Sequence, residues 1–157
     1  MHNRIVCNCL RVGATDEMVC FSLYAATRAT TQAYRALLAP WGLTYPQYLV
    51  LVLLWTEGDQ TVGRLGDELQ LDSGTLSPLL KRMEAAGFVT RTRGREDERV
   101  VVVAQTQRGR ELRAELGHIP ACIAKGTGLA DLDAARALIE TLHRLTAAMQ
   151  DVAPAAR

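Results

Sequence analysis

The chain has 157 residues, a length typical of one domain, and it is long enough to bury a core without disulfides. Its composition is 48% hydrophobic and 22% charged, which excludes a disordered chain, a collagen-like fibre and a disulfide scaffold. The formal net charge is only +1, so binding to nucleic acid would have to depend on a local basic patch.

Residues 1–15 are predicted to form a flexible N-terminal arm. We expect no signal peptide there, since Arg4, Asn8 and Arg11 interrupt the apolar run that one requires. The longest apolar stretch, residues 48–55, is far shorter than the ~20 residues of a membrane span. We therefore expect a cytoplasmic protein that has no membrane partner and whose thiols are kept reduced.

The four cysteines are Cys7, Cys9, Cys20 and Cys122. In a reducing compartment, a cysteine that has a role is catalytic, redox-sensing or metal-binding. Metal is the weaker choice, because Cys7 and Cys9 form a CxC pair rather than a CxxC pair and the histidines lack ligand spacing. We predict no metal and no cofactor.

Residues 16–39 are predicted to form one long helix. Cys20, Tyr34 and Leu38 belong to a row with alternating four- and three-residue steps, and a second apolar row runs beside it. Two adjacent rows make a broad face that must be buried. Pro40 then ends the helix.

Two shorter helical patterns follow. Pro46 suits the first turn of a helix that Gly58 closes, because the N–H that proline lacks has no partner at that position. Residues 62–69 carry the second pattern, with apolar residues at helical spacing.

A third helix is predicted to start at Asp72 or Ser73, which are good N-cap residues, and to end at Gly87. Pro78 lies inside this pattern. It implies either a helix start near Thr75 or a local distortion.

Residues 88–93 and 99–104 predict a β-hairpin, because four consecutive valines are β-branched and form too short a run for a stable helix. The tip between the two strands is polar. Two further helices are predicted, over residues 106–125 and 132–150, and the second of them carries an apolar stripe.

This order predicts a mainly α fold with a small β-hairpin wing (α+β), namely a winged helix-turn-helix with N- and C-terminal dimerisation helices. The winged part covers residues 44–105, the dimerisation helices residues 16–43 and 106–150, and a tail residues 151–157. The outer helices carry more apolar surface than one small winged domain covers, so we expect a homodimer.

The second helix of a helix-turn-helix enters the major groove of DNA, and the sequence there supplies short polar and basic side chains. The hairpin adds arginines, which can enter a narrow minor groove, and an aspartate that can orient one of them. The predicted DNA-binding residues are Ser73, Thr75, Ser77, Lys81, Arg82, Arg91, Arg93, Asp97 and Arg99. The alternative interpretation of the helix residues is an N-cap followed by a solvated helix face. The alternative interpretation of the hairpin residues is an ordinary charged hairpin tip.

Residues 71–84 (LDSGTLSPLLKRME), 87–89 (GFV), 97–99 (DER) and 107–112 (QRGREL) resemble the MarR family of winged-helix regulators. The resemblance covers residues 16–150. It implies a homodimer that binds an inverted-repeat operator in double-stranded DNA, usually as a repressor that a chemical signal releases.

Cys20 lies in the first turn of its predicted helix, where unpaired N–H groups and the helix dipole favour the nucleophilic thiolate. Tyr34 lies ~21 Å further along the same helix, so it cannot reach Cys20 of its own chain. Across an antiparallel dimer seam, it can approach Cys20 of the other chain. The alternative interpretation of Cys20 is a small buried hydrophobe.

Cys20 with Phe21, the helix that carries Tyr34, and residues 43–48 (LTYPQY) resemble the organic hydroperoxide resistance regulators (OhrR) within the MarR family. This narrower resemblance implies that Cys20 senses organic hydroperoxide and that its sulfur accepts hydrogen bonds from the hydroxyls of Tyr34 and Tyr45 of the partner subunit. The thiolate would become a sulfenic acid, which then condenses with another thiol and releases the DNA.

The identity of that second thiol stays open. Two-cysteine members of the OhrR group use a cysteine after the wing, which implies Cys122, although residues 119–123 form no sharp motif. Cys7 and Cys9 either have no role or compete with Cys122. A low-molecular-weight thiol is the remaining option.

Two other functions compete with a thiol-switched repressor. One keeps the MarR fold but assigns release to a small phenolic or hydrophobic ligand bound between the outer helices and the winged domain. The other is a thiol peroxidase, which would leave the basic wing and the recognition helix without purpose. We therefore expect a regulator and not an enzyme.

Overall fold

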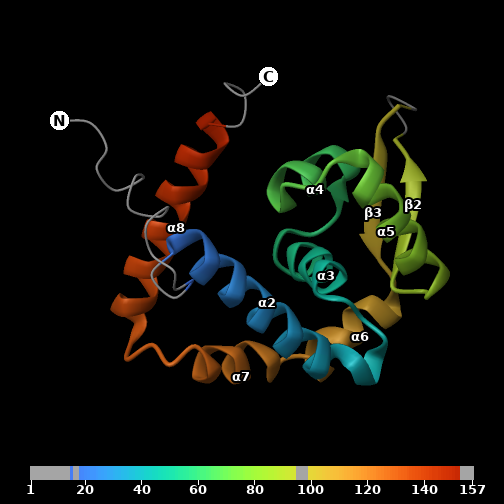
Figure 1. Cartoon of the computed structure of the whole chain (residues 1–157). Coiled ribbons are helices and arrows are strands. Elements are labelled where there is room, and N and C mark those ends of the chain that lie inside the picture. Colours follow the sequence, from blue (N-terminus) through green and yellow to red (C-terminus); the bar gives the residue numbers. More distant parts are fainter. Residues whose placement is uncertain (1–14, 16–17, 95–98, 153–157) are drawn as a thin grey trace. The chain divides into compact units, whose positions relative to one another are not determined.

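The computed structural model describes residue 15, residues 18–94 and residues 99–152 of the chain. This part is mostly helical with one small antiparallel sheet (Figure 1), which confirms the predicted fold class. The chain divides into two compact units, residues 1–117 and residues 118–157.

The first unit opens with helix α2 (Val19–Leu38), followed by the short 3-10 helix η2 (Ala39–Trp41). Gly42 ends η2 in the left-handed conformation, with φ of +64° and its N–H bonded to the carbonyl of Ala39. The predicted first helix is thus confirmed from Val19 onward, while its first two residues, 16 and 17, lie outside the described residues.

Helices α3 (Tyr45–Glu57), α4 (Val62–Leu69) and α5 (Ser73–Ala85) form the middle of the first unit. Helix α3 has Pro46 in its first turn, as predicted, and it also begins with a capping box that uses Gln47. Apolar side chains of several elements supply the core of the first unit. Fully buried examples are Leu38, Val50, Leu51, Leu54, Leu65, Leu80, Met83 and Val103.

Helix α5 begins at Ser73, so the start near Thr75, one of the two consequences expected of Pro78, is wrong. Oδ1 of Asp72 accepts the N–H of Thr75 at 2.9 Å, which stabilises the earlier start. Pro78 is the sixth residue of the helix and removes only the intrahelical bond that the carbonyl of Gly74 would accept.

Strands β2 (Val89–Arg93) and β3 (Val101–Gln105) form the predicted hairpin, with Arg91 opposite Val103. A third strand, β1 (Gln60–Thr61), pairs with the other edge of β3 and gives the sheet order β1-β3-β2. The sequence does not reveal β1, because two residues are too few to show an alternating pattern.

Helix α6 (Gln107–Glu115) belongs to the first unit, and helices α7 (Ile119–Gly126) and α8 (Leu132–Val152) belong to the second. The single helix predicted over residues 106–125 is therefore wrong. Pro120 lies in the first turn of α7, where proline starts a new helix rather than continuing an old one. Helix α8 confirms the last predicted helix.

Candidate functional site

The outward side of α5 carries the side chains that the sequence assigns to DNA. Its apolar residues Leu76, Leu80 and Met83 are buried, so the helix is anchored along one face. The predicted contact residues on the same helix are exposed. They are Ser73, Thr75, Ser77, Lys81 and Arg82.

Asp72 organises the start of α5. Its Oδ1 accepts the backbone N–H of Thr75 and its Oδ2 accepts the hydroxyl of Thr75, both at 2.9 Å. These bonds lower the pKa of Asp72, and the bond from the Thr75 hydroxyl is the largest cause. Thr75 therefore serves the cap as well as facing outward.

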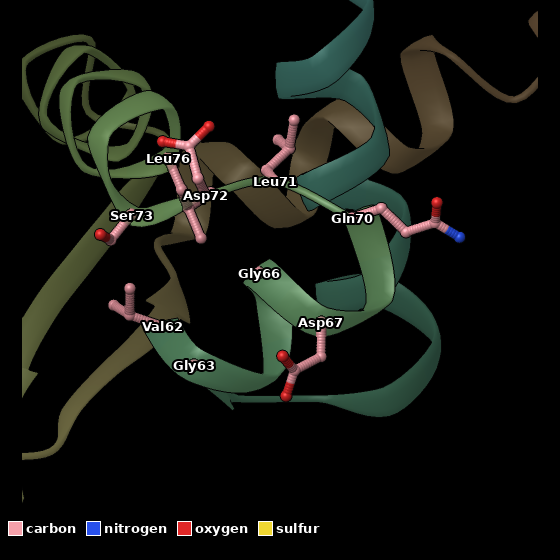
Figure 2. A pocket seen from close by; sticks show the side chains of 9 residues that line it. All are labelled: Val62, Gly63, Gly66, Asp67, Gln70, Leu71, Asp72, Ser73 and Leu76. Carbon is pink, nitrogen blue, oxygen red and sulfur yellow. The ribbon is translucent and has the colours of Figure 1, made fainter. Parts of the chain in front are cut away.

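The turn between α4 and α5 borders a hollow of about 440 Å³ (Figure 2). Gln70 is left-handed, with φ of 52°, and the N–H of Leu71 bonds to the carbonyl of Gly66 at 2.9 Å. A Cβ on Gly66 would lie 3.0 Å from the carbonyl oxygen of Leu71, so glycine permits this close turn. The lining residues are Val62, Gly63, Gly66, Asp67, Gln70, Leu71, Asp72, Ser73 and Leu76.

Arg91 of the wing is bound to Glu84 of α5. Its Nε and Nη2 lie 2.9 Å and 2.8 Å from Oε2 of Glu84, and its backbone N–H donates to Oε1 at 3.2 Å. This ion pair joins α5 to the middle of β2. Sequence reasoning placed Arg91 at the DNA and missed Glu84, although Glu84 is the only acidic residue of α5 and was the available signal.

A groove of about 410 Å³ is lined by residues of α5, of the wing and of the segment where β1 joins α4. Ser77 lines it from α5, and Arg91 and Arg99 line it from the wing side. Arg93 and Arg99 are exposed. Asp97 lies outside the described residues, so its predicted pairing with Arg99 stays a prediction.

Tyr34 of α2 and Tyr45 of α3 lie in contact, with ring centroids 4.0 Å apart and an interplanar angle of 22°. Tyr48 lies 5.8 Å from Tyr34 and 6.1 Å from Trp55 between ring centroids. Burial, the neighbouring phenols and a hydrogen bond to Tyr45 raise the pKa of Tyr34 to about 12, so Tyr34 keeps its proton. Sequence reasoning missed Tyr48, whose three-residue spacing from Tyr45 was the available signal.

Cys20 is the second residue of α2, and its thiol is free and exposed. Phe21 and Tyr24 follow it on the same helix, with their ring centroids 6.5 Å apart. Arg28 lies 5.6 Å from the centroid of the Tyr24 ring and donates to its hydroxyl at 3.3 Å.

Cys122 is exposed in α7, in the second unit, where its N–H bonds to the carbonyl of His118 at 3.1 Å. Cys7 and Cys9 lie outside the described residues. The second thiol therefore stays a prediction.

Within residues 18–94 and 99–152, no three His, Cys, Asp or Glu side chains are grouped so as to hold a metal ion. In the same part of the chain, no single helix is long and apolar enough to cross a membrane. The pair Val19–Trp41 and Tyr45–Glu57 meets that test of length and composition together, with a bend of 74° between its members.

Sequence comparisons identify regulators of transcription. Residues 32–116 match the family described as Transcriptional regulator SarA/Rot. The chain is 50% identical over 127 residues to the HTH-type transcriptional regulator TtmR of Methylorubrum extorquens, covering 81% of this chain and 65%, just under two thirds, of that protein. It is 44% identical over 135 residues to the organic hydroperoxide resistance transcriptional regulator of Bacillus subtilis, covering 82% of this chain and 92% of that protein.

Structural comparison gives the same fold. Reduced AbfR bound to DNA is 34% identical with a TM-score of 0.73, over 85% of this chain and 92% of AbfR, a protein of Staphylococcus epidermidis. Disulfide-formed AbfR is 36% identical with a TM-score of 0.62, over 83% and 91% of the two chains. These likenesses confirm the winged-helix architecture.

Proposed function

Because the chain belongs to the MarR family of winged-helix transcriptional regulators, we propose that it is a repressor whose DNA binding is switched off by oxidation of Cys20. Its relatives are DNA-binding regulators of transcription, and so is this chain. The redox part rests on one observation: Tyr34 and Tyr45 are stacked together in a chain that exposes Cys20 and resembles an organic hydroperoxide resistance regulator.

In this proposal, α5 enters the major groove with Ser73, Thr75 and Ser77 toward the base edges. Lys81 and Arg82 follow on the exposed part of the same helix and contact phosphates. From the wing, Arg93, Asp97 and Arg99 serve the minor groove, and Arg91 supports them from its ion pair with Glu84. Two copies read an inverted-repeat operator.

The homodimer is proposed from apolar side chains that a single chain leaves exposed. On α2, Val19 is 57% and Tyr24 56% exposed, and on α8 Leu132 is 74% exposed. Further large exposed residues on α8 are Leu138, Ile139, Leu142, Met149 and Val152. Such surface is normally covered by a partner, and a second copy also brings Tyr34 and Tyr45 to Cys20 of the partner subunit.

The chemistry of the switch begins with the Cys20 thiolate. Its sulfur attacks the terminal oxygen of an organic hydroperoxide, ROOH, and the O–O bond breaks. The sulfur keeps the OH group as a sulfenic acid, and RO⁻ takes up the proton that the thiol had released, giving the alcohol ROH. Hydroxyl donors such as Tyr34 and Tyr45 stabilise the thiolate before the attack.

The sulfenic acid then condenses with a second thiol to form a disulfide and water. We propose Cys122 for this step, because it is exposed and follows the wing. A low-molecular-weight thiol would give the same chemistry with a mixed disulfide. Mass spectrometry of the oxidised protein separates these products, and it also detects any bond to Cys7 or Cys9.

A gel-shift titration on the DNA upstream of the protein's own gene tests the proposal. Cumene hydroperoxide should abolish the shift of the native protein, a reductant should restore it, and Cys20→Ser should stay bound throughout. Equal release of Cys20→Ser would refute the sensor role. Release of that variant by phenolic compounds would instead favour a ligand-switched regulator, and sustained consumption of hydroperoxide with a thiol reductant would favour a peroxidase.

A further inference from the structure

Tyr48 is buried between two other aromatic side chains where α3 meets α2. It is 5% exposed, and its ring is tilted by 36° against Tyr34 and lies edge-on, at 72°, to Trp55. Tyr48 follows Tyr45 by one turn of α3, so both residues contact the ring of Tyr34 from the same helix. The ring of Tyr34 therefore packs against two other aromatic rings, those of Tyr45 and Tyr48.

The other side of Tyr48 is also fixed. The indole N–H of Trp55 donates to the carbonyl oxygen of Gly109 at 2.8 Å, and Nη1 of Arg113 donates to the carbonyl of Trp55 at 3.1 Å. These two bonds tie the end of α3 to α6. Because Trp55 is held in place, the ring of Tyr48 has a firm surface behind it.

We propose that Tyr48 is a positioning residue for the oxidation of Cys20: its ring holds Tyr34, and through the stack also Tyr45, in the orientation in which their hydroxyls reach Cys20 of the partner subunit. This inference rests on the proposed function. Tyr48 itself makes no contact with the peroxide in this scheme and moves no proton. Its contribution is the shape and rigidity of its ring.

The test measures the second-order rate of Cys20 oxidation by cumene hydroperoxide on the full-length protein, with sulfenic acid trapped by dimedone and located by mass spectrometry. Tyr48→Phe keeps the ring and should react within twofold of the native rate. Tyr48→Leu should react about 3- to 10-fold more slowly, the range expected for loss of an aromatic contact. The midpoint of its pH–rate profile should also move upward, because a thiol ionises less readily when the hydroxyl groups that stabilise its thiolate are poorly placed.

A second variant covers the case in which Tyr48→Leu does not fold. Trp55→Phe keeps an aromatic ring behind Tyr48 but loses the bond to Gly109, so it should slow oxidation by a smaller factor in the same direction. The matched control is Leu65→Val, which removes one methylene from a fully buried side chain of α4, a helix that carries none of the tyrosines. It should lower the melting temperature and leave the oxidation rate and its pH midpoint unchanged.

The inference is overturned if Tyr48→Leu reacts at the native rate with the native pH midpoint, or if Leu65→Val slows oxidation as much as Tyr48→Leu does. Failure of the proposed function looks different. In that case Cys20 of the native protein is not the residue that dimedone labels, or DNA release does not require it.

Discussion

The indole of Trp55 in α3 donates to the carbonyl oxygen of Gly109 in α6 at 2.8 Å, and Gly109 has no room for a side chain. A Cβ at this position would overlap the carbonyl oxygen of Phe88, just before β2. The same corner is closed by Thr106, whose hydroxyl donates to the carbonyl of Gly87 at 2.6 Å. Helix α3, helix α6 and the base of the wing therefore meet at one close-packed joint.

Substitution of Gly109 should show how tight this joint is. Gly109→Ala should lower the free energy of unfolding by about 2 kcal/mol or more, because the clash is with backbone and not with a flexible side chain. Urea denaturation followed by circular dichroism measures this change.

The matched control is Gly63→Ala, also within a helix. The nearest atom to its added Cβ is Oγ1 of Thr61 at 4.0 Å, so alanine should raise stability by about 0.5–1 kcal/mol. Equal effects of the two substitutions would contradict the packing described here.

Local rules predicted α3, α5 and the hairpin, and tertiary contacts decided the rest. The capping residues and the run of valines predict α3, α5 and the hairpin, because those signals act within a few residues. Strand β1 exists only because β3 offers it a free edge. The pairing of Arg91 with Glu84, and the contact of Tyr34 with Tyr48, depend on how separate elements meet, which no local pattern contains.

The cap of α5 should make stability depend on pH. The pKa of Asp72 is lowered in the folded protein, so its contribution is fully present above the unfolded pKa of about 3.9 and is lost as the pH falls through the folded value. Asp72→Asn keeps an oxygen acceptor but does not titrate. The advantage in melting temperature of the native protein over Asp72→Asn should therefore shrink as the pH falls from ~5 to below the unfolded pKa of about 3.9, and a constant difference would contradict the cap.

Tyr34 should titrate well above the range of an ordinary tyrosine. Its folded pKa, about 12, lies above the unfolded value of about 10, so its contribution to stability is present below pH ~10 and is lost as the pH rises through ~12. Ultraviolet titration of phenolate should show a late component in the native protein. Tyr34→Phe should remove that component, and a spectrum in which Tyr34→Phe loses an early component instead would disagree with the buried stack.

The ion pair between Arg91 and Glu84 makes it possible to test whether Arg91 positions the wing or contacts a DNA phosphate directly. Glu84→Gln removes a negative charge, so simple electrostatics predicts tighter binding to DNA. We expect the opposite, an affinity ~3- to 5-fold lower, because the wing loses its attachment to α5; the factor corresponds to the ~1 kcal/mol of a partly exposed pair. Fluorescence anisotropy with operator DNA at several salt concentrations measures both the affinity and its salt dependence.

The salt dependence gives the sharper comparison. Arg93 is exposed on the same strand, and Arg93→Gln should reduce the slope of log affinity against log salt by about 1, as expected when one phosphate contact is lost. Glu84→Gln should leave that slope unchanged, because no contact with phosphate is removed. Arg91→Gln should follow Glu84→Gln in both affinity and slope if Arg91 acts through α5. A slope that falls as in Arg93→Gln would instead place Arg91 directly on the DNA backbone.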